Sequence, residues 1–193
     1  MSAAEPQAPD LADDAPDGAI GDDGRLEGAR LVDAELGDRR IAKLWLVDVE
    51  ARGCDFANVR ARGATLRRVC FRSCRFTGAL FTEARLEDVT FTDCRIDLAS
   101  FGRTVLQRVG FERCVLTGAD LIDAELTSAR FRDCDLSDAD LSEGRWKDCE
   151  LRGCRITAVR GIEALRGAAM PVDDIVGSAG TFAAALGIRV LES

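Results

Sequence analysis

Residues 114–138 read CVLTG ADLID AELTS ARFRD CDLSD, which is five units of five residues in one phase. The third residue of each unit is a large apolar side chain, and the first is Ala or Cys. The third position stays apolar outward in both directions, from Leu26 to Ile156, over 27 consecutive units. Neither the helical period of 3.6 nor the strand period of 2 produces this pattern, and a short fixed repeat is typical of solenoids. The sequence therefore predicts an all-β solenoid.

A longer period, equal to four of these units, is visible in the cysteines and phenylalanines. Both residue types recur at this spacing at inward positions, so four units make one four-sided coil and equivalent residues stack in columns. Successive coils are expected to pair edge to edge, about 4.8 Å apart. The predicted core columns contain Cys54, Cys74, Cys94, Cys114, Cys134 and Cys154, and Phe71, Phe91, Phe111 and Phe131.

This pattern resembles the pentapeptide-repeat family, whose motif is A-[DN]-L-x-x around a central Leu or Phe. Ala119-Asp120-Leu121 and Ala139-Asp140-Leu141 match the motif as written. The resemblance implies a right-handed quadrilateral β-helix, which we expect to span residues 25–160. It does not fix the function, because one fold hosts many functions.

The two ends of the chain differ from the repeat. Residues 1–24 hold seven acidic and no basic side chains among Ala and Pro, which predicts a disordered acidic tail that could fold back on the coils. Residues 161–193 are expected to form a C-terminal cap and dimerisation segment, with one helix from Pro171 to Gly187 and a short strand at 188–191. We find no signal peptide and no apolar run long enough to span a membrane, so a cytoplasmic location is expected.

Catalysis finds little support in the composition. The chain has no His and no Tyr, and it carries no Gly-rich phosphate loop or C-x-x-C pair. We therefore expect no enzyme activity, no metal, no cofactor and no small-molecule substrate. The inward cysteines are interpreted as small apolar core residues, Cys149 included, whereas Cys70 falls at an outward position and is the candidate for an accessible thiol.

Charge is polarised along the predicted rod. Residues 51–75 carry seven Arg against one acid, and residues 116–150 carry ten acids against four basic residues. By the four-unit period, an acidic face is expected from Asp120, Asp123, Asp140, Glu143 and Glu163. Direct nucleic-acid binding through the arginines is disfavoured, because the formal net charge is −8.

A narrower resemblance concerns the C-terminus. Leu165-Arg166-Gly167-Ala168 and the finish Ala185-Leu186-Gly187-Ile188-Arg189-Val190 resemble the quinolone-resistance members of the Qnr and MfpA type. That resemblance implies an end-to-end homodimer that imitates duplex DNA and occupies the DNA-binding saddle of DNA gyrase. The implied dimer contacts are Ile175, Phe182, Leu186, Ile188 and Val190.

Two functional hypotheses follow. The first is a DNA mimic that binds DNA gyrase or topoisomerase and modulates its activity or protects it from fluoroquinolones. The alternative is a cytoplasmic protein–protein interaction scaffold whose partner the sequence does not identify.

Overall fold

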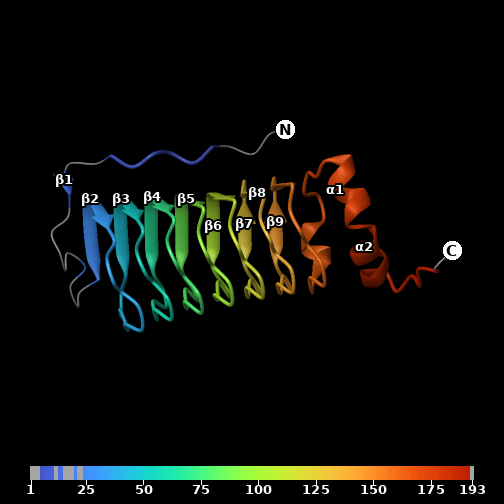
Figure 1. Ribbon diagram of the computed structural model, residues 1–193, viewed down its shortest axis with the longest axis horizontal. Helices are drawn as coiled ribbons and strands as arrows, with labels where there is room; N and C mark the ends of the chain where they lie inside the picture. Colours follow the sequence, from blue (N-terminus) through green and yellow to red (C-terminus); the bar gives the residue numbers. More distant parts are fainter. Residues whose placement is uncertain (1–4, 11–12, 15–19, 21–23, 192–193) are drawn as a thin grey trace.

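The protein folds as an all-parallel β-solenoid in the computed structural model, which describes residues 5–10, 13–14, 20 and 24–191 (Figure 1). The first five coils each contribute one eight-residue strand that runs over two sides, and the last two coils each contribute a pair of short strands. These strands are β2 Arg25–Val32, β3 Trp45–Arg52, β4 Thr65–Arg72, β5 Arg85–Thr92, β6 Val105–Glu112, β7 Glu125–Thr127, β8 Arg130–Arg132, β9 Arg145–Lys147 and β10 Glu150–Arg152. The predicted fold is confirmed.

The register between coils is constant, and each residue pairs with its equivalent in the next coil, four units later. Phe71 of β4 faces Phe91 of β5, and Leu86 of β5 faces Leu106 of β6. On the other two sides of the square the coils meet through single parallel bridges, such as Ser100 with Asp120. Equivalent residues therefore lie directly above one another along the axis.

The corners of the coil depend on a feature of the sequence that the apolar pattern does not reveal. Every fifth residue from Gly28 to Ala158 has a positive φ, Lys43 excepted. Most of these positions hold Gly, Asp or Asn, the residues that tolerate the left-handed conformation at least cost. Each such residue turns the chain by one side of the square, two positions after the large inward residue.

The core consists of continuous columns of buried side chains. Phe91 stacks on Phe71 and on Phe111, with ring centroids 5.0 Å apart in both pairs. Phe131 continues the column and ends against Trp146, 5.3 Å away. Each fully buried Phe or Leu contributes roughly 1.5–3 kcal/mol, so these columns supply most of the stabilising free energy.

The C-terminal end closes the solenoid with short helices. The 3-10 helix η1, Ile162–Leu165, buries Ile162 and Leu165 against the last coil, and the amide of Leu151 then donates to the carbonyl of Ala169 at 3.0 Å. Helices α1 (Val172–Gly177) and α2 (Ala179–Ala185) follow, at the red end of Figure 1.

Two details of this segment differ from the prediction. The single helix is divided at Ser178, whose φ of −101° and ψ of 7° interrupt the helical path between Gly177 and Gly180. Glycine has a low helix propensity, so two glycines beside this residue favour the break. Residues 188–191 have no strand partner and form no strand. Within the described part of the chain, no helix combines the length and apolarity needed to cross a membrane.

The described part of the N-terminal segment lies against the solenoid. We name residues 5–10 and 13–14 the N-terminal strap. In Figure 1 residues 5–10 run along the strands from about the level of β6 toward the first coil, where β1 (Asp13–Asp14) pairs with β2. Ile20 then packs into the first coil, only 2% exposed. The strap is held by contacts with coils that are distant in the sequence, and amino-acid composition carries no information about such contacts. Residues 1–4, 11–12, 15–19 and 21–23 lie outside the described residues.

Candidate partner-binding surface

The predicted acidic face separates into two rows with different chemistry. Asp120 and Asp140 are bridged neighbours on one side of the square, as the period predicted. Their carboxylates are already engaged: Asp120 accepts from the Ser100 hydroxyl at 2.7 Å, and Asp140 accepts from Arg160 Nε at 2.9 Å. Partial burial opposes ionisation of Asp140, but hydrogen bonds from Ser142 and Arg160 outweigh it and lower its pKa. This row stabilises the coils and offers little free charge.

The second row is more open. Asp123 and Glu143 occupy the same corner of successive coils, with φ of 55° and 60°. Glu143 is exposed, and the side chain of Asp123 is 43% exposed, 4.0 Å from Arg145. Glu163 is also exposed, but it lies in η1 and has left the coil register. The free carboxylates of the predicted face are therefore those of Glu143 and Glu163, near the C-terminal end.

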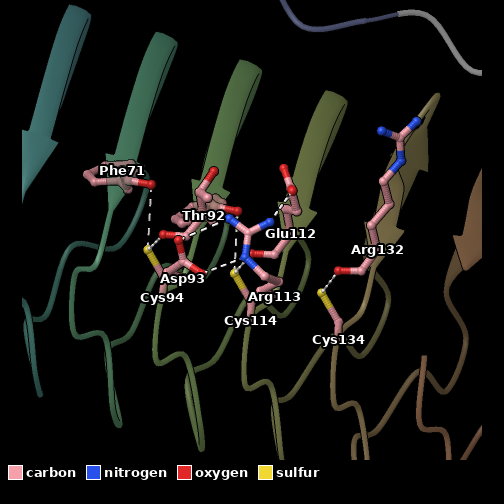
Figure 2. A network of polar contacts seen from close by, with 10 residues as sticks. Phe71, Thr92, Asp93, Cys94, Glu112, Arg113, Cys114, Arg132 and Cys134 are labelled. Atoms are coloured by element: carbon pink, nitrogen blue, oxygen red, sulfur yellow. Dashed lines mark hydrogen bonds and ion pairs between the residues drawn. The ribbon is translucent and has the colours of Figure 1, made fainter. Parts of the chain in front are cut away.

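Arginines one coil away neutralise many other acids. Among the described residues, eight ion pairs join an acid to the arginine at the equivalent position of the next coil: Asp48–Arg68, Asp55–Arg75, Glu83–Arg103, Asp88–Arg108, Asp93–Arg113, Glu125–Arg145, Asp135–Arg155 and Asp140–Arg160. Figure 2 shows one of them, in which Arg113 contacts both Asp93 and Glu112. Most of these side chains are partly exposed, so each pair contributes little to stability on its own. Together, however, these pairs reduce the separation of positive and negative charge along the rod that a count along the sequence suggests.

The arginine-rich first coils illustrate the same compensation. Glu50 lies within 3.6 Å of Arg52 and 3.5 Å of Arg72, and Arg62 forms a bidentate pair with Glu83 of the next coil. Pairing between coils thus offsets much of the positive charge that residues 51–75 carry as a linear segment.

The inward cysteines are buried apolar residues with satisfied thiols. Cys94 Sγ lies 3.3 Å from the carbonyl oxygen of Thr92 and 3.6 Å from that of Phe71 (Figure 2). All eight cysteines are free, and Cys70 is the one that is not buried. Burial raises the pKa of the Cys149 thiol to about 11, which makes it unreactive at neutral pH. The described residues contain no group of three or more His, Cys, Asp or Glu side chains arranged to hold a metal ion.

The predicted dimer residues fall into two groups. Leu186, Ile188 and Val190 are 76%, 57% and 70% exposed, and Ile175 is 45% exposed. Phe182 instead packs against the core at the end of the solenoid, so its side chain attaches α2 to the last coils. The C-terminus therefore presents exposed apolar side chains beyond α2, at the same end of the rod as Glu143 and Glu163 (Figure 1).

Comparison with known proteins agrees with the geometry. The family model described as "Pentapeptide repeat region" matches residues 44–121 and 97–160, and the chain belongs to the pentapeptide-repeat family. A search of the curated proteins finds no match.

Solved structures similar to the chain include members of several kinds. A trypsin-treated form of QnrB1, a plasmid-mediated fluoroquinolone resistance protein, is 16% identical, with 95% of this chain and 98% of that chain covered and a TM-score of 0.36. HetL, a pentapeptide-repeat protein involved in heterocyst differentiation regulation in Nostoc sp. strain PCC 7120, is 20% identical, with 74% of this chain and 90% of that chain covered and a TM-score of 0.25. A pentapeptide-repeat protein of the Arabidopsis thaliana thylakoid lumen is 16% identical, with 50% of this chain and 71% of that chain covered and a TM-score of 0.36.

Proposed function

We propose that this protein is a non-catalytic binding protein that acts as a mimic of DNA, and that its partner is the DNA-binding surface of a topoisomerase such as DNA gyrase. The observation that carries this proposal is the joint position of free carboxylates and exposed apolar side chains at one end of the rod. A two-fold contact through Leu186, Ile188 and Val190 would bring the acidic ends of two chains together. This role requires a cytoplasmic protein.

Physical chemistry supports an acidic rod as a competitor for DNA. A DNA-binding saddle is lined with cations that release counterions when a polyanion binds, so a rod with carboxylates at its centre can occupy it. Asp123, Glu143 and Glu163 supply that charge, since the Asp120 and Asp140 carboxylates are already hydrogen bonded within the fold. Their neutralisation should weaken binding with little effect on the coils.

The experiment is a supercoiling assay with purified bacterial DNA gyrase, titrated with the wild type and with the triple variant Asp123→Asn, Glu143→Gln, Glu163→Gln. We expect inhibition by the wild type, weakened about tenfold or more in the variant, if each charge contributes about 0.5–1 kcal/mol. The matched control is Asp33→Asn, Glu35→Gln, Asp38→Asn, which removes three exposed charges from the first coil. Equal inhibition by both variants would contradict the proposal.

The dimer is tested separately by light scattering. Leu186→Glu together with Val190→Glu should give a monomer, because both side chains are exposed and their loss disturbs no core contact. A wild type that is monomeric at high concentration would remove the geometry on which the mimic depends.

The alternative is a scaffold that binds a protein outside nucleic-acid machinery. The arginine–carboxylate pairs favour it, because they leave the body of the rod nearly neutral. No effect on gyrase at tens of micromolar, with an intact dimer, would support this alternative.

A further inference from the structure

The N-terminal strap runs across successive coils along one corner of the solenoid. The Glu5 carboxylate lies 3.3 Å from Arg130, the Gln7 amide donates to Asp88 Oδ1 at 3.2 Å, and the Asp10 amide donates to Asp48 Oδ1 at 3.1 Å. Asp13 then pairs with Ala29. Three extended residues reach about 10 Å, and the two coil spacings between Asp88 and Asp48 also rise about 10 Å. The strap is therefore fully extended between Gln7 and Asp10, as a bound peptide is.

The corner beneath the strap is shaped for this occupant. The Pro6 ring lies over Gly110, where a Cβ atom would stand 3.8 Å from the ring Cγ, and it forms one wall of a notch of about 130 Å³ that Thr90 and Phe111 also line. Arg130 is 9% exposed, and its Nε is buried with no hydrogen-bond partner in the described residues. The neighbouring carboxylate of Glu150 is paired with Arg152. Glu5 thus brings to Arg130 the negative charge that a buried guanidinium needs.

The corner also holds acceptors for the backbone of an extended peptide. Asp48 and Asp88 stand two coils apart, each clamped by the arginine of the following coil, Arg68 or Arg108. These arginines lower the pKa of both carboxyls, so both are ionised at neutral pH and accept from peptide amides. The spacing of two coils matches the three residues from Gln7 to Asp10.

The strap is held loosely. Glu5, Gln7, Ala8 and Asp10 are exposed, and the Glu5 side chain is 83% exposed. A few surface contacts of about 1 kcal/mol each, aided by the tether, retain such a segment without locking it in place.

We propose that this corner is a binding groove for an extended acidic peptide that contains proline, and that the chain's own N-terminal strap is a resident occupant that a partner's acidic segment displaces. Arg130 pairs with a carboxylate of the peptide, and the proline ring packs at the notch over Gly110. Asp48 and Asp88 accept hydrogen bonds from the peptide backbone. The groove uses none of the free carboxylates near the C-terminal end and is independent of any action on gyrase.

The test uses the full chain and a fluorescein-labelled synthetic peptide of residues 5–14. Glu5→Arg places like charges at Arg130, so it should release the strap and let the peptide bind at least about fivefold more tightly than it binds the wild type, by fluorescence anisotropy. Glu35→Arg makes the same charge change at an exposed position on another side of the square and should bind as the wild type does. A peptide with Arg in place of Glu5 should bind neither.

Cys70 gives a second readout within the native sequence. It lies in β4 next to Thr90 in the register, between the coils on which Asp10 and Gln7 are anchored. Its alkylation by iodoacetamide, followed by mass spectrometry, should be faster in Glu5→Arg and should slow again when the unlabelled peptide is added.

Two results would overturn the proposal. One is equal peptide affinity for the wild type and for Glu5→Arg, which would mean that the strap does not compete. The other is no binding to Glu5→Arg at about 1 mM peptide, the effective concentration of a short tether. Circular dichroism confirms that each variant is folded, and neither readout involves gyrase.

Discussion

Replacement of Phe91 by Ala tests whether the stacked aromatic column stabilises the solenoid beyond simple burial. Phe91 is 2% exposed and contacts three rings: Phe71 and Phe111 at 5.0 Å, and Phe76 edge-on at 5.5 Å. Phe-to-Ala changes in cores cost about 3–5 kcal/mol, and aromatic pairs contribute about 0.5–1.5 kcal/mol beyond their buried area. We therefore expect a loss of about 5 kcal/mol for Phe91→Ala, at the upper end of the range.

Phe101 provides the matched comparison. It is 1% exposed, but among the described rings it contacts only Phe81, at 5.8 Å. Phe101→Ala removes the same atoms and should cost about 3 kcal/mol. The outward Thr92→Ala, next to Phe91 on the same strand, should stay within about 0.5 kcal/mol of the wild type.

The assay is guanidinium unfolding followed by circular dichroism, with thermal melting as a second measure. At about 2–4 °C per kcal/mol, Phe91→Ala should melt roughly 10–20 °C below the wild type. Solenoids can unfold in parts, so the denaturant slope must be compared between variants. If Phe91→Ala costs no more than Phe101→Ala, the ring contacts add nothing and the reasoning is refuted.

Three further predictions concern pH, glycine and thiol chemistry. Arg68 and Arg108 depress the folded-state pKa of Asp48 and Asp88 below the ordinary 3.8, so these pairs stabilise the fold above that pH and stop doing so as the pH falls through the folded-state pKa. The unfolding midpoint should therefore be constant from about pH 8 to 5 and drop below about pH 4. The drop should be less steep in Asp88→Asn, which lacks one of the two carboxylates. Gly161→Ala should lower the free energy of unfolding by about 2–4 kcal/mol, because Gly161 has a φ of +66° and the new methyl would lie 2.3 Å from the Ser142 amide nitrogen. Gly180→Ala in α2 meets open space, so it should raise the free energy of unfolding by about 0.5–1 kcal/mol in the same denaturant titration. Iodoacetamide should modify one of the eight cysteines in the native protein, Cys70, and a mass increase of several adducts without denaturant would contradict the burial of the others.

The sequence predicts the solenoid and its columns well, because an unbroken repeat reports directly on the inward positions. Leu86, Leu106 and Leu126 stack as their spacing of four units requires. The same spacing also carries the ion pairs, such as Asp88 with Arg108, which become visible when charges are aligned by coil. A charge count along a linear segment hides them, because it separates partners that lie one coil apart.

Other features follow from contacts that composition and short periods do not encode. The strap is acidic and rich in proline, which is typical of disordered segments, yet its amides find Asp48 and Asp88 at fixed positions on the rod. The helical pattern of the cap does not show the break at Ser178. The roles of Asp123, Glu143 and Glu163 and of the dimer residues stay predictions.

The constant register between coils limits how the gene for this chain can change length. Loss or gain of one coil leaves every column aligned, whereas insertion of a single five-residue unit rotates Cys and Phe columns onto different sides. Each added coil also lengthens the path of the N-terminal strap by about 4.8 Å, or one to two extended residues. Successful duplications in this lineage should therefore occur in whole coils and be accompanied by one or two residues near the N-terminus.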